Sequence, residues 1–241
     1  MNIRIETWKN LKEKPEVALG FGKNFTDHMF VMDWSRDKGW YDERIVPYGP
    51  MIIDPVAMVL HYAQETFEGL KAYMGKDNNV YLFRPEMNAR RFANSNRRMC
   101  MPEVPEDMFI EAISEIVKVE KSWIPTGEGE SLYIRPFMYA NQSGLGVDEA
   151  DSYRFMIVLS PVGAYYPQGV NPVKIYVEDE LTRTTVGGTG FVKCGGNYAG
   201  SLAGQVKAQK LGYTQVLWLD GVHRKYVEEV EAMDAMFLVK D

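Results

Sequence analysis

Apolar residues recur at helical spacing in the middle of the chain. Between residues 107 and 123 they stand three or four positions apart, and glutamates occupy the opposite positions. Side chains with this spacing share one face of a helix, so the pattern predicts an amphipathic helix. Pro85 suits the first turn of a helix and predicts a second one, which carries Met87, Arg91 and Phe92.

Alternation and short apolar runs predict strands. Along residues 132–139, Tyr133, Arg135, Phe137 and Tyr139 share one face of a strand, and apolar residues share the other. A face with three aromatic rings and one arginine is suited to lining a pocket. Further strands are predicted over residues 80–83, 154–160, 173–177, 215–219 and 235–239.

The first fifty residues show no sustained period. They mix aromatic residues, glycines and prolines, so we expect irregular structure with short extended pieces near residues 30–33 and 38–41. Towards the other end, a helix is expected from about Tyr198 to Leu211, where Gly212 ends it, and Asp220 begins a turn.

Prolines and glycines cluster again between residues 161 and 172, which is the strongest linker signal in the chain. We therefore expect two domains. The first covers residues 1–163, a linker covers 164–172, and the second domain covers 173–241.

Composition and charge narrow the class of function. The 241 residues are 46% hydrophobic and 25% charged, which is ordinary for a soluble globular protein. No apolar run is long enough to span a bilayer, and the charged N-terminus does not fit a signal peptide, so we expect a cytoplasmic protein without membrane contact. The net charge of -6 argues against nucleic acid and favours a small-molecule ligand.

Cysteine and histidine usage argues against a metal site. Cys100 and Cys194 are far apart and form no C-x-x-C pair, which indicates reduced thiols. The three histidines form no metal-binding motif. We therefore expect no catalytic metal.

The segment around Lys193 is the strongest candidate for chemistry. Residues 186–200 hold one lysine among six glycines. Glycine lets the backbone approach a ligand closely, and a lysine that reacts with a carbonyl needs a fixed, partly desolvated amine. The segment is therefore interpreted as an active-site loop, with a mobile glycine loop and an incidental lysine as the alternative.

Nucleotide-binding loops fit these glycines poorly. A phosphate loop needs glycine directly before the lysine, where Val192 stands, and serine or threonine after it, where Cys194 stands. A dinucleotide fingerprint needs its third glycine at position 193, which is the lysine itself. A nucleotide-binding oxidoreductase is kept only as a weaker alternative.

Several motifs follow one another in a recognisable order. They are residues 60–73 (LHYAQETFEGLKAY), 82–85 (LFRP), 131–136 (SLYIRP), 161–165 (PVGAY), 193–198 (KCGGNY) and 215–219 (QVLWL). With these motifs the chain resembles the branched-chain amino acid aminotransferases, which are fold-type IV pyridoxal-phosphate enzymes. The resemblance covers most of the chain. It implies an α/β (α+β) fold of two domains, and residues 173–241 would be the N-terminal part of a cofactor-binding large domain truncated at its C-terminus.

The resemblance also implies a reaction. The amino group of L-leucine, L-isoleucine or L-valine is transferred to 2-oxoglutarate, with pyridoxal 5'-phosphate as cofactor. Lys193 corresponds to the catalytic lysine that forms a Schiff base with the cofactor, and Tyr198 to the tyrosine that bonds its phenolic oxygen. Arg91 corresponds to the arginine that holds the phosphate. Glu229 corresponds to the carboxylate facing the pyridine nitrogen, and its neighbour Glu228 stays open as the alternative.

The family's substrate pocket falls on six positions of this chain. An aromatic wall for an aliphatic side chain and a guanidinium for carboxylates would coexist there, as a site for both leucine and glutamate requires. The loop at residues 145–147 implies a homodimer in which each subunit reaches its neighbour's active site. The six substrate-binding positions are Tyr62, Phe67, Tyr133, Arg135, Tyr165 and Ala232.

Two departures from the family pattern keep other interpretations open. Glu231 and Asp234 stand where the family has glycine and asparagine, and the sequence stops at Asp241, where family members continue. The alternatives are another fold-type IV enzyme, namely a D-amino acid aminotransferase or an aminodeoxychorismate lyase, or a catalytically inactive truncated relative.

Overall fold

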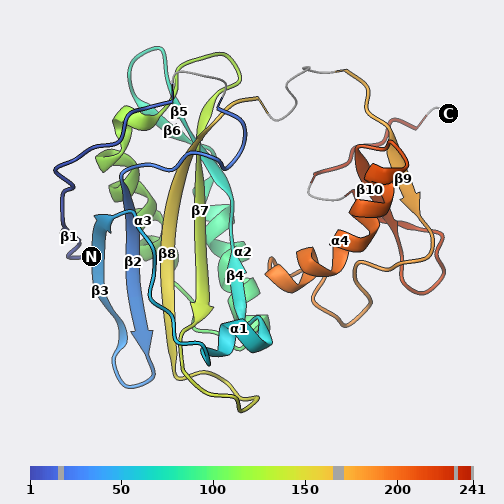
Figure 1. Cartoon of the computed structure of the whole chain (residues 1–241), viewed down its shortest axis with the longest axis horizontal. Coiled ribbons are helices and arrows are strands. Elements are labelled where there is room, and N and C mark those ends of the chain that lie inside the picture. Colours follow the sequence, from blue (N-terminus) through green and yellow to red (C-terminus); the bar gives the residue numbers. More distant parts are fainter. Residues whose placement is uncertain (16–18, 165–170, 231–232, 240–241) are drawn as a thin grey trace. The chain divides into compact units, whose positions relative to one another are not determined.

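The computed structural model describes residues 1–15, 19–164, 171–230 and 233–239 (Figure 1). The chain divides into two compact units, Met1–Gly169 and Val170–Asp241. Most of the linker expected over residues 164–172 lies outside the described residues, so that boundary stays a prediction. Among the helices of the described part, none is both long and apolar enough to cross a membrane.

The first unit is built on an eight-stranded sheet. Its strands follow the order β1-β3-β2-β8-β7-β5-β6, and β4 also pairs with β7. The β1–β3 pair is parallel and the others are antiparallel. The strands are β1 (Arg4–Ile5), β2 (His28–Ser35), β3 (Gly39–Pro47), β4 (Glu65–Phe67), β5 (Leu70–Met74), β6 (Val80–Leu82), β7 (Ser131–Ala140) and β8 (Ser152–Val162).

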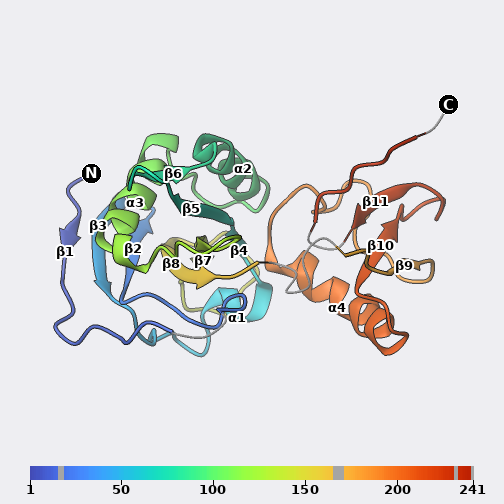
Figure 2. The ribbon, with the colours of Figure 1, turned by 90° about the horizontal axis from the view of Figure 1, so that it is seen from above.

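Helices α2 and α3 lie on one side of this sheet and the short helix α1 on the other (Figure 2). The rings of Phe92 and Phe109 pack against Phe155 of the sheet, with centroids 5.6 Å and 6.0 Å away. The expected helices near residues 85 and 107–123 are thereby confirmed, the second ending earlier than predicted. The helices are α1 (Met58–Tyr62), α2 (Pro85–Arg98), α3 (Glu106–Val119) and the 3-10 turn η1 (Lys121–Trp123).

The two faces of β7 have the predicted characters. Leu132, Ile134 and Met138 are fully buried in the core under α2 and α3. Tyr133 and Arg135, on the opposite face, are only half-buried. The alternation seen in the sequence therefore places an aromatic and cationic surface on the side of the sheet away from its main core.

The extended pieces expected near residues 30–33 and 38–41 are confirmed, but the prediction of irregular structure around them is wrong for residues 28–47. These residues form the antiparallel strands β2 and β3, and β2 also pairs with β8. The first six residues of β2 are all buried. Because a strand covered on both faces has no polar side, it lacks the alternation by which strands are recognised.

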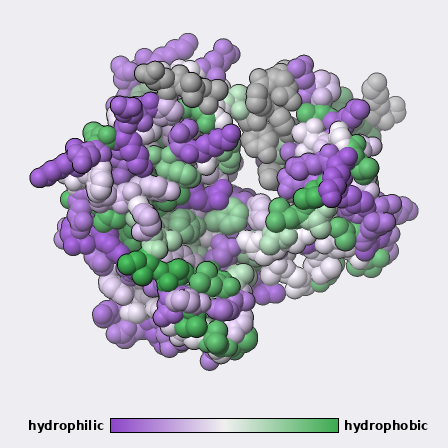
Figure 3. All heavy atoms as spheres, in the orientation of Figure 1, coloured by the Kyte–Doolittle hydropathy of each residue, from purple (hydrophilic) through white to green (hydrophobic). Residues whose placement is uncertain are grey.

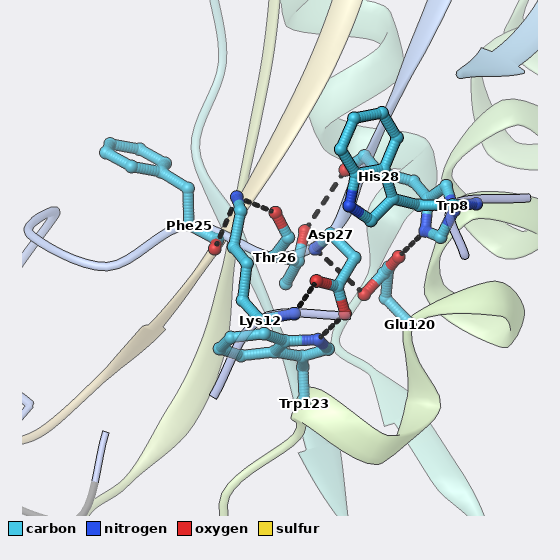
Figure 4. A network of polar contacts seen from close by, with 8 residues as sticks. All are labelled: Trp8, Lys12, Phe25, Thr26, Asp27, His28, Glu120 and Trp123. Atoms are coloured by element: carbon cyan, nitrogen blue, oxygen red, sulfur yellow. Dashed lines mark hydrogen bonds and ion pairs between the residues drawn. The ribbon is translucent and has the colours of Figure 1, made fainter. Parts of the chain in front are cut away.

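A buried polar network holds the segment around residues 8–12, which precedes β2, against the rest of the first unit (Figure 4). The backbone N–H of Trp8 donates to His28 Nε2 at 2.8 Å, and His28 Nδ1 pairs with the buried carboxylate of Glu120. The backbone N–H of Lys12 donates to Asp27 Oδ1 at 2.8 Å. Burial raises the pKa of Glu120, against the opposing effect of its bond to His28. The network therefore fixes the backbone at residues 8 and 12.

The second unit has a three-stranded sheet and one long helix. Strands β9 and β10 are parallel and joined through α4, and β11 pairs antiparallel with β10. Helix α4 begins at Gly195 rather than near Tyr198, because a glycine pair gives no helical signal in the sequence. Gly212, with φ +81°, follows its end as expected. The elements are β9 (Ile175–Glu178), α4 (Gly195–Lys210), β10 (Gln215–Leu219) and β11 (Val227–Val230).

The strand predicted over residues 235–239 is wrong. The structure gives these residues no strand, and the nearest pairing is an isolated bridge between Val230 and Met233. An apolar run becomes a strand only where a neighbouring backbone takes up its hydrogen bonds. Within the described part of this unit no such neighbour pairs with the run.

Close packing between α4 and β10 depends on one glycine. Trp218 of β10 is fully buried, and its cluster also contains Ala208 of α4 and Val216. A Cβ added at Gly204 of α4 would lie 2.5 Å from Cη2 of Trp218. Gly204 therefore allows the helix to lie directly on the indole ring.

We expect Gly204→Ala to lower the free energy of unfolding by about 1–3 kcal/mol, because the added methyl group overpacks against Trp218. Denaturant unfolding followed by circular dichroism measures this change. Gly200→Ala is the matched control in the same helix, since no atom lies within 4 Å of its Cβ position, and it should stabilise by about 0.5–1 kcal/mol. Equal effects of the two substitutions would contradict the packing argument.

Candidate active site

Lys193 and Tyr198 come together at the start of α4. The amine Nζ of Lys193 donates to the phenolic Oη of Tyr198 at 2.6 Å. Both side chains are half-buried, and Cys194 between them is buried. An amine and a phenol at this distance can share and pass a proton. The pair predicted from the sequence is therefore assembled in the second unit.

Arg183 joins this pair to Glu229. Its guanidinium lies 5.6 Å from the centroid of the Tyr198 ring, and Nη1 lies 3.7 Å from Glu229 Oε2. The Arg183 side chain is only 8% exposed, so the charge is largely shielded from water. Sequence reasoning missed Arg183 because it stands in a loop without a motif. The cluster thus combines an amine, a phenol, a guanidinium and a carboxylate.

A cavity of about 270 Å³ opens beside Arg183 and Glu229 of this cluster. Its wall is formed mainly by the loop before Lys193, which is tightly folded on itself. A Cβ added at Gly190 would lie 3.0 Å from Thr184 Oγ1, and one added at Gly188 would lie 3.0 Å from the carbonyl oxygen of Thr185. The lining residues are Arg183, Thr184, Thr185, Val186, Gly187, Gly188, Gly190, Phe191, Glu228 and Glu229.

Asp220 fixes the hairpin that carries Glu229. Its carboxylate accepts backbone N–H bonds from His223 at 2.6 Å and from Lys225 and Tyr226 at 2.8 Å. The bonds from Tyr226, His223 and Lys225 hold the pKa of Asp220 well below its usual range. With the turn closed in this way, Glu229 pairs in register with Trp218 on β10.

In the first unit, Arg135 lies among aromatic rings. Its guanidinium carbon is 4.7 Å from the ring centroid of Phe67 and 5.2 Å from that of Tyr133. Nη2 also donates to the Tyr133 hydroxyl at 2.7 Å. A cavity of about 370 Å³ is lined by Phe67 and Arg135 together with Glu65 and Phe137. The structure therefore brings three of the expected substrate-binding residues together.

Gly69 makes room for this arrangement. A Cβ at Gly69 would lie 2.3 Å from the Tyr133 hydroxyl oxygen. The Tyr133 ring consequently crosses the backbone between β4 and β5. This close approach gives a physical reason for the glycine in the motif at residues 60–73.

The other expected substrate-binding residues are placed differently. Tyr62, at the end of α1, donates its hydroxyl to the backbone carbonyl of Leu145 at 2.5 Å. It is therefore joined to the loop at residues 143–147. Tyr165 and Ala232 lie outside the described residues.

Arg91 is held by a buried carboxylate. Its Nε and Nη2 donate to the two oxygens of Glu68 at 2.6 Å and 2.9 Å, and Asn88 Nδ2 donates to Glu68 Oε2 at 2.8 Å. The Glu68 side chain is 0% exposed, whereas that of Arg91 is 53% exposed. The fork-shaped contact fixes the plane of the guanidinium. Sequence reasoning missed Glu68, although a glutamate directly before the glycine of the motif was a usable signal.

Comparison with known proteins shows related sequences. No protein-family model matches the chain. Branched-chain-amino-acid aminotransferase 2 of Bacillus subtilis is 52% identical over 238 residues, which are 98% of this chain and 66% of the relative. Branched-chain-amino-acid transaminase 1 of the same organism is 52% identical over 243 residues, covering 99% of this chain and 68% of the relative. The chain thus spans about two thirds of the length of these relatives.

Solved structures share the fold. A T.th. branched-chain amino acid aminotransferase with pyridoxamine 5'-phosphate matches with a TM-score of 0.67 and 25% identity, covering 83% of this chain and 62% of the other. The enzyme from Thermoproteus uzoniensis with norvaline matches with a TM-score of 0.69 and 24% identity, covering 85% of this chain and 63% of the other.

Replacing Glu68 by glutamine is expected to lower the free energy of unfolding by about 1.5–3 kcal/mol, because two charge-assisted bonds from Arg91 weaken and a buried amide replaces a paired carboxylate. Denaturant unfolding at neutral pH measures the change. Glu86→Gln is the control, since Glu86 is partly exposed and lies 3.9 Å from the exposed Arg84, and it should change stability by less than about 0.5 kcal/mol. An equally small effect of Glu68→Gln would refute a stabilising role for the buried pair.

Proposed function

The chain belongs to the branched-chain amino acid aminotransferase family, and from this membership we propose that it transfers the amino group of L-leucine, L-isoleucine or L-valine to 2-oxoglutarate, with pyridoxal 5'-phosphate as cofactor. The observation that carries the proposal is the 2.6 Å contact between the Lys193 amine and the Tyr198 phenol, which follows a glycine loop that lines a cavity together with Glu229.

The groups in the second unit fit such a cofactor chemically. Pyridoxal phosphate supplies an aldehyde that condenses with an amine and a ring that withdraws electrons from the attached carbon. Lys193 provides the amine, Tyr198 provides a phenol beside it, and Glu229 provides a carboxylate paired with Arg183. The glycine loop lines a cavity together with Arg183 and Glu229.

Lys193 has two proposed tasks. Its amine would hold the cofactor by condensing with the aldehyde, with loss of water, and the free amine would move the proton from the α-carbon of the amino acid. Tyr198 orients the amine through the contact between Oη and Nζ and hydrogen-bonds the cofactor's phenolic oxygen. The support is that both side chains are half-buried in one contact, which limits the positions the amine can take.

Charged residues of each unit are proposed to bind the cofactor. We propose that Glu229 faces the pyridine nitrogen and keeps a proton there, with Arg183 orienting the carboxylate. Arg91 would bind the phosphate, and the bidentate contact with Glu68 prepares its guanidinium for a fixed direction.

Substrate binding is assigned to the aromatic side of the first unit. Phe67 and Tyr133 offer apolar surface for a branched side chain, and Arg135 offers a cation for a carboxylate. A pocket of this mixed kind suits a site that must accept both leucine and glutamate in turn. Tyr62 joins this set, and Tyr165 and Ala232 remain members by prediction.

We also propose a homodimer. Exposed apolar side chains occur on α1, on the segment before it and on the loop at residues 143–147, and green spheres gather over α1 in Figure 3. The Tyr62 hydroxyl and a backbone bond from Gly144 to Val56 tie this loop to the α1 region. An exposed apolar surface of this kind is suited to a subunit contact. Its exposed residues are Met51, Ile52, Val56, Leu60, Leu145 and Val147.

We expect the purified protein with pyridoxal phosphate to convert L-leucine and 2-oxoglutarate into the leucine-derived 2-oxo acid and L-glutamate, followed by chromatography of both products. Lys193→Ala should lower this rate by about a thousandfold or more, because the reacting amine is removed. Lys210→Ala, an exposed lysine of α4, is the control and should retain the rate.

Parallel assays with D-alanine and aminodeoxychorismate separate the other fold-type IV reactions. Turnover of either in place of L-leucine would replace the proposed substrate class. A folded, cofactor-loaded protein with no turnover of any of the three would identify an inactive relative.

We predict that Leu145→Glu weakens the dimer by about tenfold or more, because a charge enters an apolar contact. Sedimentation equilibrium measures the dissociation constant. Phe83→Glu, an exposed apolar residue between β6 and α2, is the control. A monomeric wild-type protein at all accessible concentrations would rule the dimer out.

The cytoplasmic location also remains a prediction, which cell fractionation tests.

A further inference from the structure

Asn197 fastens the turn that precedes Lys193 to the first turn of α4. Its Nδ2 donates to the backbone carbonyls of Thr189 and Val192, both at 2.7 Å. Its Oδ1 accepts from the Thr189 hydroxyl at 2.7 Å. Asn197 is only 5% exposed, so water competes little for these bonds.

The hydrogen bonds of Asn197 to Thr189 and Val192 form a clamp, and the position of this clamp along the chain connects it to the reactive amine. The bond from Asn197 to the Val192 carbonyl closes a short loop, and Lys193 follows directly after Val192. Tyr198 follows directly after Asn197. The clamp therefore fixes the two backbone points from which the paired amine and phenol extend, and their separation of 2.6 Å depends on both points.

The surrounding glycines make such a clamp necessary. Glycines precede and follow Lys193 closely, and each has more backbone freedom to lose on ordering than any other residue. An asparagine side chain can donate to two carbonyls and accept from a hydroxyl at the same time. An aspartate at this position would have no N–H to offer and would place a negative charge against two carbonyl oxygens.

We propose that Asn197 is a positioning residue that holds Lys193 against Tyr198 through the Thr189–Val192 turn, an inference that rests on the proposed role of Lys193 as the reacting amine. Asn197 acts through the backbone, since its side-chain amide is bonded to Thr189 and to the carbonyl of Val192. Thr189 is its partner, since the hydroxyl completes the bonding of the amide.

The first readout needs no cofactor. The cofactor-free protein is treated with formaldehyde and cyanoborohydride, and methylation of Lys193 is timed by peptide mass spectrometry relative to the exposed Lys210. Asn197→Ala is expected to raise the relative rate at Lys193 by roughly threefold or more, because the released turn exposes the amine. Thr189→Val should give a smaller rise, and Thr189→Ser, which keeps the hydroxyl, should restore the wild-type rate.

The second readout is the rate at which pyridoxal phosphate becomes attached to Lys193, trapped by borohydride and mapped by peptide. Asn197→Ala is expected to slow attachment by about a hundredfold, since a displacement near 1 Å at a reacting group has a cost of this order. Thr189→Val, which keeps both carbonyl contacts, should slow it less. This second variant decides the question if Asn197→Ala does not fold.

A stability-matched control separates positioning from simple destabilisation. Gly204→Ala strains α4 against Trp218 without touching the clamp, so it should leave both readouts at their wild-type values. If the clamp variants behave like Gly204→Ala in both readouts, Asn197 is only a structural residue and the inference is overturned. A wild-type protein that attaches no cofactor at Lys193 would instead refute the proposed function, and the methylation rates would still decide the inference.

Discussion

The reaction proposed for the second unit depends on keeping the Lys193 amine 2.6 Å from the Tyr198 phenol. Two groups at that distance on a glycine-rich segment require support from outside the segment, because glycine itself contributes no side-chain packing. Asn197 provides this support by tying the preceding turn to the helix. Gly204 and Asp220 fix other parts of the unit, since Gly204 lets the helix lie on Trp218 and Asp220 closes the hairpin that carries Glu229. The positioning of the reactive pair therefore depends on how the buried residues of this unit are held together.

In the first unit, a buried charge orients a group that the proposed function uses. Glu68 lies in the interior and holds the half-exposed Arg91 by a bidentate contact, while Gly69 beside it lets Tyr133 cross the backbone next to Arg135. One short turn between two strands thus orients the guanidinium groups of Arg91 and Arg135, which the proposed function uses. Burying a carboxylate has a cost in desolvation, which the bonds from Arg91 and Asn88 offset. The need to orient a guanidinium for binding an anion explains why a carboxylate is buried here despite this cost.

The sequence predicted those parts of the fold that show a period. Strands β7 and β10 and the helices α2 and α3 alternate or repeat clearly, and each was found where expected. Strand β2 was expected only as a short extended piece because both of its faces are covered, and the first turn of α4 was missed because two glycines form it. Within the site, Lys193 was recognisable by its setting. Arg183 was not, since it stands outside every motif and contacts Glu229 across space. Asn197 lies within the motif at residues 193–198, but its role was not recognised because it acts through backbone carbonyls.

Lys193 is proposed as the amine that binds the cofactor, and covalent trapping is the most direct test of this role. The wild-type protein is mixed with pyridoxal phosphate, reduced with borohydride, digested and mapped by mass spectrometry. We expect a label on Lys193 at about one per chain and little on exposed lysines such as Lys210, as for one specific site. A label spread over exposed lysines, with Lys193 no richer than the rest, would contradict it.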